Sequence, residues 1–297
     1  MDRKIIVAGS REFNDYKLLK FTLDMLVRKY PKEDKLTFIS GKARGADFYG
    51  EQYAKSIGAE LLEFQADWDA YGKSAGYIRN AEMGKIADTL VAFWDYKSVG
   101  TRNMIEIMRK KNADVYIINT SNVNENTRIS YETRDILTVK SGIIGHQVNC
   151  RKVMGGGLAL QVRLTYPKVY EKYLEVEPLL GRCALVRVSD ELQIANLYGQ
   201  YNYGKSIPKK ISEFGKGTSD KIVHTDYKAL ALSLQKLFNY ANKNNKRVYL
   251  PYKIGCTLGG GDWNVVLPII SILAELYKVN VTICKLPEGM IKWENMG

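Results

Sequence analysis

Two glycine triplets in the second half of the chain have the composition of anion-binding turns. The first lies in GHQVNCRKVMGGGLA (residues 145–159), where an apolar run and a basic turn precede the glycines and an amphipathic segment follows them. The second, in PYKIGCTLGGGDW, also stands between an apolar run and a helical pattern. Glycine lets backbone N–H groups approach an anion, and a helix N-terminus adds partial positive charge. The two turns are therefore predicted to grip a diphosphate, although such glycines also serve as plain tight connections.

Small, cationic and hydroxyl side chains follow three predicted strands in the first half. They are Ser10 and Arg11 after the first strand, Lys42 and Arg44 between glycines after the second, and Asp95, Ser98, Gly100 and Thr101 after the fourth. Backbone donors with a bidentate Arg suit a phosphate, and a Gly-Thr pair at a helix start adds an anion site. Parallel sheets bind ligands at the carboxyl ends of their strands. These turns therefore predict a nucleotide-type ligand.

The elements that must hold these residues alternate regularly between strand and helix over residues 4–119. Such alternation predicts an α/β domain with a parallel sheet covered by helices on both faces. The polar segment TSNVNENTR at residues 120–128 has no periodicity and is predicted to be a linker. The chain thus divides into a first domain at 1–119 and a second at 129–297.

The second half is predicted to begin with a strand over residues 129–139 and to alternate strands and helices to its end. Residues 199–221, GQYNYGKSIPKKISEFGKGTSDK, are too long for a plain connection and form a candidate lid. Asp262 stands where a helix N-cap belongs, because Asp accepts the first free N–H groups of a helix. A catalytic or ribose-binding role for Asp262 is the alternative.

Several aromatic residues in the first half could stack on a base. Phe93 lies inside an apolar strand, so core packing is the better interpretation. Trp68 and Tyr71 lie in a polar segment that we expect to be a loop, and they are the stronger candidates for stacking.

The motifs GSREF, SGKARGADFYGEQYA, DWDAYGKSAGYIRNAEM and ADTLVAFWDYKSVGT resemble the YpsA-like branch of the SLOG superfamily over roughly residues 1–119. That resemblance implies a Rossmann-like domain that binds nucleotides and ADP-ribose derivatives and that could also form homo-oligomers. It implies a pocket lined by Gly9, Ser10, Arg11, Gly41, Arg44, Gly45, Asp47, Arg79, Asn80, Ser98, Gly100 and Thr101. Related nucleotide phosphoribohydrolases carry a glutamate where this chain has Met104, and Glu106 falls on another helix face. Binding is therefore expected instead of hydrolysis.

The second half resembles a macro domain, over roughly residues 129–290. The motifs are Arg134-Asp135-Ile136, GHQVNCRKVMGGGLA, ANLYGQ and PYKIGCTLGGGDW. The resemblance implies an α/β/α fold with a mixed sheet that binds ADP-ribose, in some members with hydrolysis of ADP-ribosyl groups or of ADP-ribose 1''-phosphate. It implies that Asp135 and Ile136 meet the adenine and Asn149 the distal ribose. The implied diphosphate cradle consists of Met154, Gly155, Gly156, Gly157, Leu158 and Ala159 with Thr257, Leu258, Gly259, Gly260, Gly261 and Asp262.

One hydrolase branch of that family uses a lysine and an aspartate, and the corresponding places here hold Gln200 and Gly259. A covalent lysine mechanism cannot run on Gln, which has no nucleophilic amine. If hydrolysis persists, Asn149 and Asp262 are the candidates for positioning a water. His146 and His224 are weaker candidates, because a lone His carries little weight and is more often structural.

Composition narrows the classes of partner and compartment. The net charge of +12 favours anionic partners but does not choose between nucleotides and nucleic acid. The cysteines at 150, 183, 256 and 284 form no CxxC pair, so zinc is unlikely to be bound and reduced thiols in a cytoplasm are expected, the host's if the gene is a phage gene. No apolar run approaches a membrane span.

Three functions therefore remain open. The favoured one is a binder of ADP-ribose-type, NAD-derived nucleotides through both domains, without a required cofactor or metal, that sequesters or processes a signal in bacterial or phage defence. The second is a macro-type ADP-ribosyl hydrolase or ADP-ribose 1''-phosphate phosphatase. The third, a nucleic-acid-associated protein, rests on charge alone and is not favoured.

Overall fold

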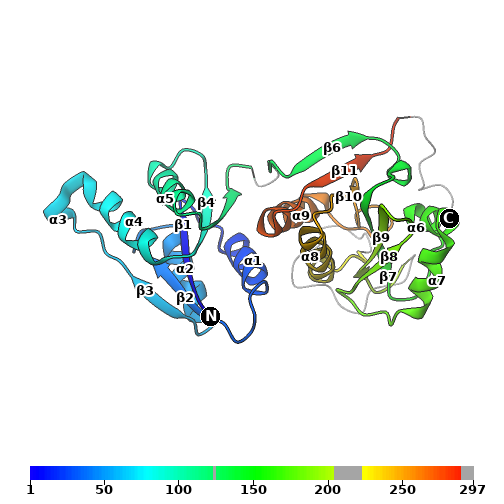
Figure 1. Ribbon diagram of the computed structural model, residues 1–297, viewed down its shortest axis with the longest axis horizontal. Helices are drawn as coiled ribbons and strands as arrows, with labels where there is room; N and C mark the ends of the chain where they lie inside the picture. The colour runs from blue at the N-terminus through cyan, green and yellow to red at the C-terminus, as the bar shows by residue number, and fades with distance from the viewer. Residues whose placement is uncertain (123–124, 204–222, 289–297) are drawn as a thin grey trace. The chain divides into compact units, whose positions relative to one another are not determined.

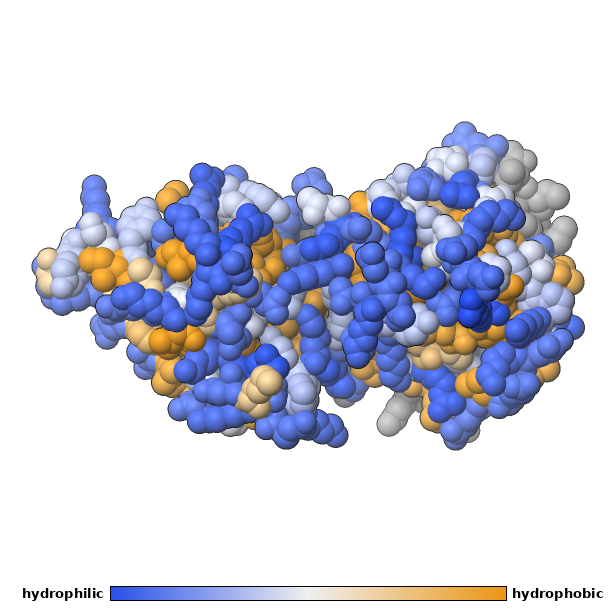
Figure 2. All heavy atoms as spheres, in the orientation of Figure 1, coloured by the Kyte–Doolittle hydropathy of each residue, from blue (hydrophilic) through white to orange (hydrophobic). Residues whose placement is uncertain are grey.

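The computed structural model describes residues 1–122, 125–203 and 223–288. The chain forms two compact units, Met1–Glu125 and Asn126–Gly297, whose boundary falls inside the polar segment at residues 120–128 (Figure 1). The face turned to the viewer in Figure 2 is predominantly hydrophilic, with apolar residues in scattered small areas, as expected for a chain with many charged residues.

The first unit is a five-stranded, all-parallel sheet in the order β3-β2-β1-β4-β5. Its strands are β1 (Asp2–Gly9), β2 (Lys35–Ser40), β3 (Glu60–Glu63), β4 (Thr89–Trp94) and β5 (Asp114–Asn119). Its helices are α1 (Tyr16–Val27), α2 (Ala46–Ser56), α3 (Trp68–Tyr71), the 3-10 turn η1 (Gly72–Ser74), α4 (Ala75–Ile86) and α5 (Val99–Lys110).

Alternating residues of β1 divide this sheet into two covered faces. Ile6 and Ala8 pack with residues of α4 and α5 in one apolar cluster. Val7 points to the opposite face, where its side chain lies against Gly50 of α2. Helices therefore cover both faces, as the alternation of strands and helices predicted (Figure 1).

The second unit is a six-stranded mixed sheet in the order β6-β11-β10-β7-β9-β8, in which β8 alone runs antiparallel to its neighbour. Its strands are β6 (Ile129–Thr133), β7 (Gly142–Asn149), β8 (Cys183–Arg187), β9 (Leu192–Gln200), β10 (Val248–Pro251) and β11 (Val281–Lys285). Its helices are the 3-10 turn η2 (Ile136–Thr138), α6 (Gly157–Thr165), α7 (Pro167–Glu175), α8 (Tyr227–Lys243) and α9 (Trp263–Tyr277).

Alternating residues of β7 likewise face the two opposite sides of this sheet. Ile144 packs with Val162 of α6 and Val169 of α7. Gly145 faces the other side, where Leu237 of α8 and Leu250 crowd the place of a Cβ. The predicted fold class, a Rossmann-like parallel domain followed by an α/β/α domain with a mixed sheet, is confirmed.

Two local predictions were wrong. The strand expected over residues 129–139 ends at Thr133, because Asp135 accepts a hydrogen bond from the Leu137 N–H (2.9 Å) and turns the chain into η2. The loop expected around Trp68 and Tyr71 is the short helix α3, which Asp67 caps by accepting from the Ala70 N–H (2.9 Å). Gly199 and Gln200 of the candidate lid belong to β9, and its residues 204–221 lie outside the described residues.

Candidate functional site

The carboxyl edge of the first sheet is hollowed. A cavity of about 480 Å³, called the first hollow here, lies where β1 and β4 end. Small-molecule sites usually enclose about 300–1,000 Å³, so this hollow has the size of one. The predicted residues that line it are Gly9, Ser10, Arg11, Asp47, Arg79, Asn80, Asp95, Ser98, Gly100 and Thr101. The turns that the sequence placed at separate strand ends therefore meet at one site.

The start of helix α5 forms one wall of the first hollow. Ser98 caps the helix, and its Oγ lies 2.9 Å from the hydroxyl of Thr101. Asp95 accepts from the N–H groups of Lys97 (2.9 Å) and Ser98 (2.7 Å). Burial acts to raise the pKa of Asp95, but these N–H donors outweigh it and the pKa is lowered. Asp95 is therefore an ionised residue that shapes the turn.

Gly100, in the first turn of α5, has free space where a side chain would begin, unlike most of the glycines around it. A Cβ added there would meet no heavy atom within 4 Å. A Cβ on Gly45 would collide with the backbone of Ser10, and Gly45 lines neither hollow of this unit. Packing thus explains Gly45, whereas Gly100 leaves the helix N-terminus open to a ligand.

Arg79 of α4 lies flat against Gly41. Its Nη1 donates to the Gly41 carbonyl, and its Nε donates to Asn80 (3.2 Å). Asp47 is buried below them and accepts from the Gly41 N–H (3.0 Å). Burial raises the pKa of Asp47 to about 6, although the charge of Arg79 works against the rise. Asn80 also donates to the Gly100 carbonyl (3.2 Å), which ties the arginine wall to the start of α5.

A second hollow of about 360 Å³ shares Arg11, Ala43, Trp68 and Arg79 with the first. Its other lining residues are Gly41, Lys42, Arg44, Gln65 and Ala66. Lys42, predicted to meet a phosphate, forms ion pairs with Glu51 (3.1 Å) and Glu63 (2.9 Å), so those carboxylates balance its charge.

The aromatic residues that could stack on a base differ in whether they line the hollows. Trp68 is 51% exposed and lines both hollows, and Tyr77 of α4 lines the first. Tyr71 lines neither of these hollows. Phe93 is fully buried, with its ring 4.9 Å from that of Phe13, as predicted for a core residue. The sequence did not single out Tyr77 over Tyr71, because which ring lines the cavity depends on how both α3 and α4 fold at this edge of the sheet.

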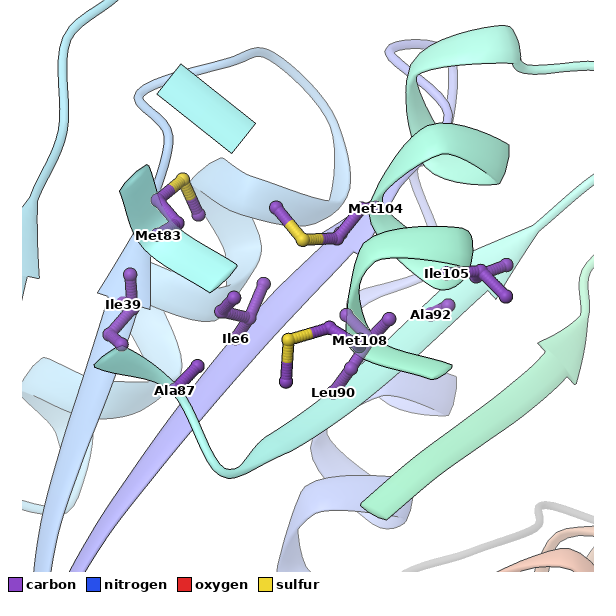
Figure 3. Close-up of a cluster of buried hydrophobic side chains, with 10 residues drawn as sticks. Ile6, Ile39, Met83, Ala87, Leu90, Ala92, Met104, Ile105 and Met108 are labelled. Atoms are coloured by element: carbon purple, nitrogen blue, oxygen red, sulfur yellow. The ribbon is translucent and has the colours of Figure 1, made fainter. Parts of the chain in front are cut away.

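The floor of the first hollow is apolar. Met83 of α4 and Met104 of α5 line it and belong to the apolar cluster around Ile6. Figure 3 shows these side chains coming together from the two helices and β1. Glu106 is exposed on α5 and does not line the hollow. Position 104 is thus a buried thioether beside the hollow, and the acid of the same helix lies outside it.

In the second unit, Asn149 holds the loop that follows β7. Its Oδ1 accepts from the N–H groups of Arg151 (2.9 Å) and Val153 (3.2 Å), and its Nδ2 donates to the Val153 carbonyl (2.6 Å). Tyr173 of α7 donates to the Asn149 carbonyl (2.6 Å). The carboxamide is therefore engaged in loop structure, and contact with a ribose or a water would come in addition to these bonds. The side chain of Met154, a residue of the predicted cradle, is buried in an apolar cluster with Tyr173.

The two glycine turns meet through Leu258. Gly156 caps α6 in extended conformation, and Gly157 has a φ of 56°. A Cβ on Gly156 or Gly157 would lie 3.3 or 3.1 Å from the Cδ1 of Leu258. Because β7 and β10 are parallel neighbours, their following turns lie at one edge of the sheet. The structure thus brings the predicted halves of the cradle together.

Within the second turn, packing requires most of the glycines. A Cβ on Gly259 would lie 2.5 Å from the hydroxyl of Thr225 and 2.6 Å from the Gly255 carbonyl. The Gly259 carbonyl accepts from the N–H groups of His224 (2.8 Å) and Thr225 (3.0 Å). Gly260 has a φ of 69°, a conformation that favours glycine.

The remaining members of the predicted cradle flank these glycines. Asp262 caps α9 and accepts from the Asn264 N–H (2.9 Å), so the capping interpretation is the one the structure shows. Gly155 and Thr257 are exposed, and Leu158 and Ala159 are half-buried in the first turn of α6. Gly261 donates its N–H to the Gly255 carbonyl (2.9 Å).

A glutamine pair, which the sequence pattern did not reveal, supports the second turn. Gln147 of β7 donates through Nε2 to Gln200 of β9 (2.6 Å) and to Thr225 (2.9 Å). Thr225 in turn donates to the Gly255 carbonyl (2.6 Å). A polar residue inside the apolar run before the first triplet was the available signal.

Of the adenine candidates, Asp135 is half-buried as the cap of η2, whereas Ile136 is buried in the apolar cluster with Ile144. The side chain of Ile136 therefore supports the core in this structure.

The histidine His146 is structural, as expected. It is fully buried, and its Nε2 lies 2.7 Å from the Oδ1 of Asn196. Burial lowers the pKa of His146 to about 4, against the effect of the Asn196 hydrogen bond, so its ring is neutral at pH 7. His224 is also buried.

Among the described residues, no group of three or more His, Cys, Asp or Glu side chains is arranged to hold a metal ion. In the same part of the chain, no helix combines the length and apolar character that crossing a membrane requires.

Comparisons with known proteins divide along the two units. Residues 3–71 match the model of a family described as YspA, cpYpsA-related SLOG. The Gene 61 protein of Mycobacterium phage D29 is 32% identical over 123 residues, which cover 39% of this chain and 95% of that protein.

An ADP-ribose 1''-phosphate phosphatase of Saccharomyces cerevisiae is 29% identical over 170 residues, which cover 54% of this chain and 87% of that enzyme. Among solved structures, a macrodomain protein from Streptomyces coelicolor is 26% identical with a TM-score of 0.41, over 52% of this chain and 97% of that one.

Proposed function

We propose that both units of the chain bind NAD-derived nucleotides of the ADP-ribose type. Through its first unit the chain belongs to the YspA, cpYpsA-related SLOG family. Its second unit is a macro-type domain. For the second unit, the yeast relative is named for a phosphorylated ADP-ribose, and for the first unit the nucleotide rests on the SLOG resemblance and on the first hollow. The expected role is to sequester or process such a nucleotide, and the similar phage protein makes phage–host conflict the setting to examine.

The observation that carries this proposal is the contact of Leu258 with Gly156 and Gly157. The turn after β7 leads into the N-terminus of α6, whose first N–H groups can meet a phosphate, and the turn after β10 lies beside it. The N–H groups of Gly260 and Gly261 donate within that second turn, to the carbonyls of Thr257 (3.1 Å) and Gly255 (2.9 Å), so this turn contributes shape to the cradle. The first hollow supports it independently. Its volume, its arginines Arg11 and Arg79 and the open N-terminus of α5 at Gly100 suit a nucleotide phosphate.

Calorimetric titration of the full chain with ADP-ribose and with cyclic ADP-ribose isomers tests the proposal. We expect dissociation constants below about 1 mM, the weak limit of specific recognition. If neither ADP-ribose nor any cyclic ADP-ribose isomer gives a heat of binding up to that concentration, the proposed function is contradicted.

In the second unit, binding is favoured over hydrolysis because neither Gln200 nor Gly259 carries a catalytic side chain. Gln200 is buried and accepts from Gln147 (2.6 Å), and it has no nucleophilic amine. Gly259 has no room for a carboxylate side chain beside Thr225. Both places that the macro-domain resemblance assigns to catalysis are thus occupied by structural groups.

A hydrolase remains the second candidate function, favoured by similarity to the yeast phosphatase. Asn149 and Asp262 would then position water, the first from its loop and the second from the start of α9. Incubation with ADP-ribose 1''-phosphate and with ADP-ribosylated protein, scored for released phosphate and ADP-ribose, separates an enzyme from a binder. Turnover that persists in both Asn149→Ala and Asp262→Ala would remove this assignment.

A further inference from the structure

The charged residues that line the second hollow are all cations. Its lining includes Arg11, Lys42, Arg44 and Arg79, and no Asp or Glu. Glu51 and Glu63, outside the lining, balance Lys42. Arg44 has only a 3.9 Å contact with Glu12, and both side chains are at least 80% exposed, so that pair contributes little. The hollow therefore keeps a positive charge that its own wall does not compensate.

Arg11 and Arg79 stand where the two hollows join, since both residues line both cavities. Within the described residues, Arg11 forms no ion pair. Burial lowers the pKa of Arg79, and the nearby charge of Arg11 lowers it further, while Asp47 acts in the opposite direction. Two guanidinium groups whose charges repel each other are stabilised when an anion binds between them.

The residues on either side of Arg11 and Arg79 indicate which end of the nucleotide lies in which hollow. Tyr77 and the apolar floor of Met83 and Met104 lie in the first hollow, which is also the larger one. An adenine-type base and its ribose fit these surfaces. With the diphosphate at Arg11 and Arg79, the distal end of the same molecule enters the second hollow, beside Arg44.

We propose that the ligand of the first unit carries a phosphate monoester on its distal sugar and that the second hollow, through Arg44, binds this phosphate. This inference rests on the proposed function, because it presupposes that an ADP-ribose-type nucleotide occupies the first hollow. It adds the class of ligand: ADP-ribose phosphorylated at the distal ribose, in preference to unmodified ADP-ribose. The exposed guanidinium of Arg44, whose ion pair with Glu12 spans 3.9 Å, lies beside the Arg11 and Arg79 pair and has the chemistry for such a group.

The test compares ADP-ribose, ADP-ribose 1''-phosphate and ADP-ribose 2'-phosphate in the full chain. The readout is the tryptophan fluorescence change that disappears in Trp68→Phe, because Trp68 lines both hollows and reports on this unit. We expect the 1''-phosphate to bind about tenfold more tightly than ADP-ribose, the factor expected for one charge-assisted contact at a partly exposed site. The 2'-phosphate, at the base end, should bring no gain.

Arg44→Gln is the decisive variant, because its side chain is 80% exposed and its removal leaves the fold intact. It should abolish the tenfold gain, so that ADP-ribose 1''-phosphate and ADP-ribose bind this variant with equal affinity within about twofold. Lys55→Gln is the matched control, since Lys55 is an exposed cation of α2 outside both hollows. It should leave the gain unchanged.

The outcomes separate this inference from the proposed function. If ADP-ribose binds and the 1''-phosphate adds nothing, or Lys55→Gln reduces the gain as much as Arg44→Gln does, the second hollow is not a phosphate site. A gain with the 2'-phosphate instead would reverse the direction of the ligand and also overturn the inference. If none of the three binds this unit, the proposed function of the first unit fails.

Discussion

The side chain of Leu258 lies across Gly157, with its Cδ1 3.1 Å from the place that a Cβ of this glycine would occupy. Through this contact the turn after β7 and the turn after β10 share one surface. A ligand that meets the N-terminus of α6 would therefore also lie against the turn after β10, and it needs Gly157 to carry no side chain.

Gly157→Ala should weaken both ADP-ribose binding and stability. The residue has a φ of 56°, where an L-residue is strained by roughly 1–2 kcal/mol, and its methyl group would press on Leu258. Urea denaturation and calorimetry measure the two effects. Gly155→Ala is the control, because its Cβ would be 3.4 Å from Val153 and its φ is not positive. Equal losses in both variants would contradict the role assigned to Gly157.

Gly100→Ala should have opposite effects on stability and on binding. Alanine is the better helix former by up to about 1 kcal/mol, and the place of its methyl is empty in the structure. The free energy of unfolding should therefore rise, while nucleotide affinity in the first hollow falls. Gly84→Ala is the contrasting variant, because a Cβ there would collide with Ile107 and should destabilise the protein. Unchanged affinity in Gly100→Ala would show that the α5 N-terminus does not meet the ligand.

Asp47 should make stability depend on pH in a defined window. Burial raises its pKa from 3.8 to about 6, so the folded state binds the proton more tightly than the unfolded state. Between about pH 4 and pH 6 the folded protein holds more protons, and the free energy of unfolding contributed by this group falls as pH rises. Below pH 4 and above pH 6 the contribution is flat.

Asp47→Asn removes this titration and keeps an acceptor for the Gly41 N–H. Relative to the unmodified protein, the variant should become progressively more stable from pH 4 to pH 6, by an amount on the order of 1–3 kcal/mol. Urea denaturation across this range is the measurement. A stability difference that does not change with pH would show that Asp47 titrates normally.

Gln200→Lys should destabilise the second unit without creating a hydrolase. The substitution removes the acceptor for Gln147 Nε2 and buries an amine, and breaking such a network costs roughly 1–3 kcal/mol. Gly259 still lacks the carboxylate that the macro-domain resemblance pairs with a lysine. Thermal unfolding and release of ADP-ribose from modified protein check both parts. Efficient turnover by this variant would mean that the missing lysine alone separates the chain from a hydrolase.

The sequence was sufficient to predict features that depend on short-range chemistry. The turns at Ser10, Arg44 and Gly100 could be placed at strand ends from the alternation of apolar and polar segments, and the parallel sheet brings them to one edge. The cap at Asp262 likewise depends only on its neighbours.

Features that depend on distant partners could not be predicted. Lys42 has the composition of a phosphate ligand, but Glu63 on the next strand balances it. Met154 stands inside a glycine motif, yet its side chain packs against α7. Gln147 and Gln200 are 53 positions apart and pair only because β7 and β9 are neighbours. Each case needs the register of the sheet, which local pattern does not supply.

The most direct test of the central claim is a calorimetric titration of the full chain with ADP-ribose, repeated with Gly100→Ala and Gly157→Ala. We expect two binding events below about 1 mM, of which Gly100→Ala weakens one and Gly157→Ala the other. Absence of binding, or a single event that neither variant changes, would contradict it.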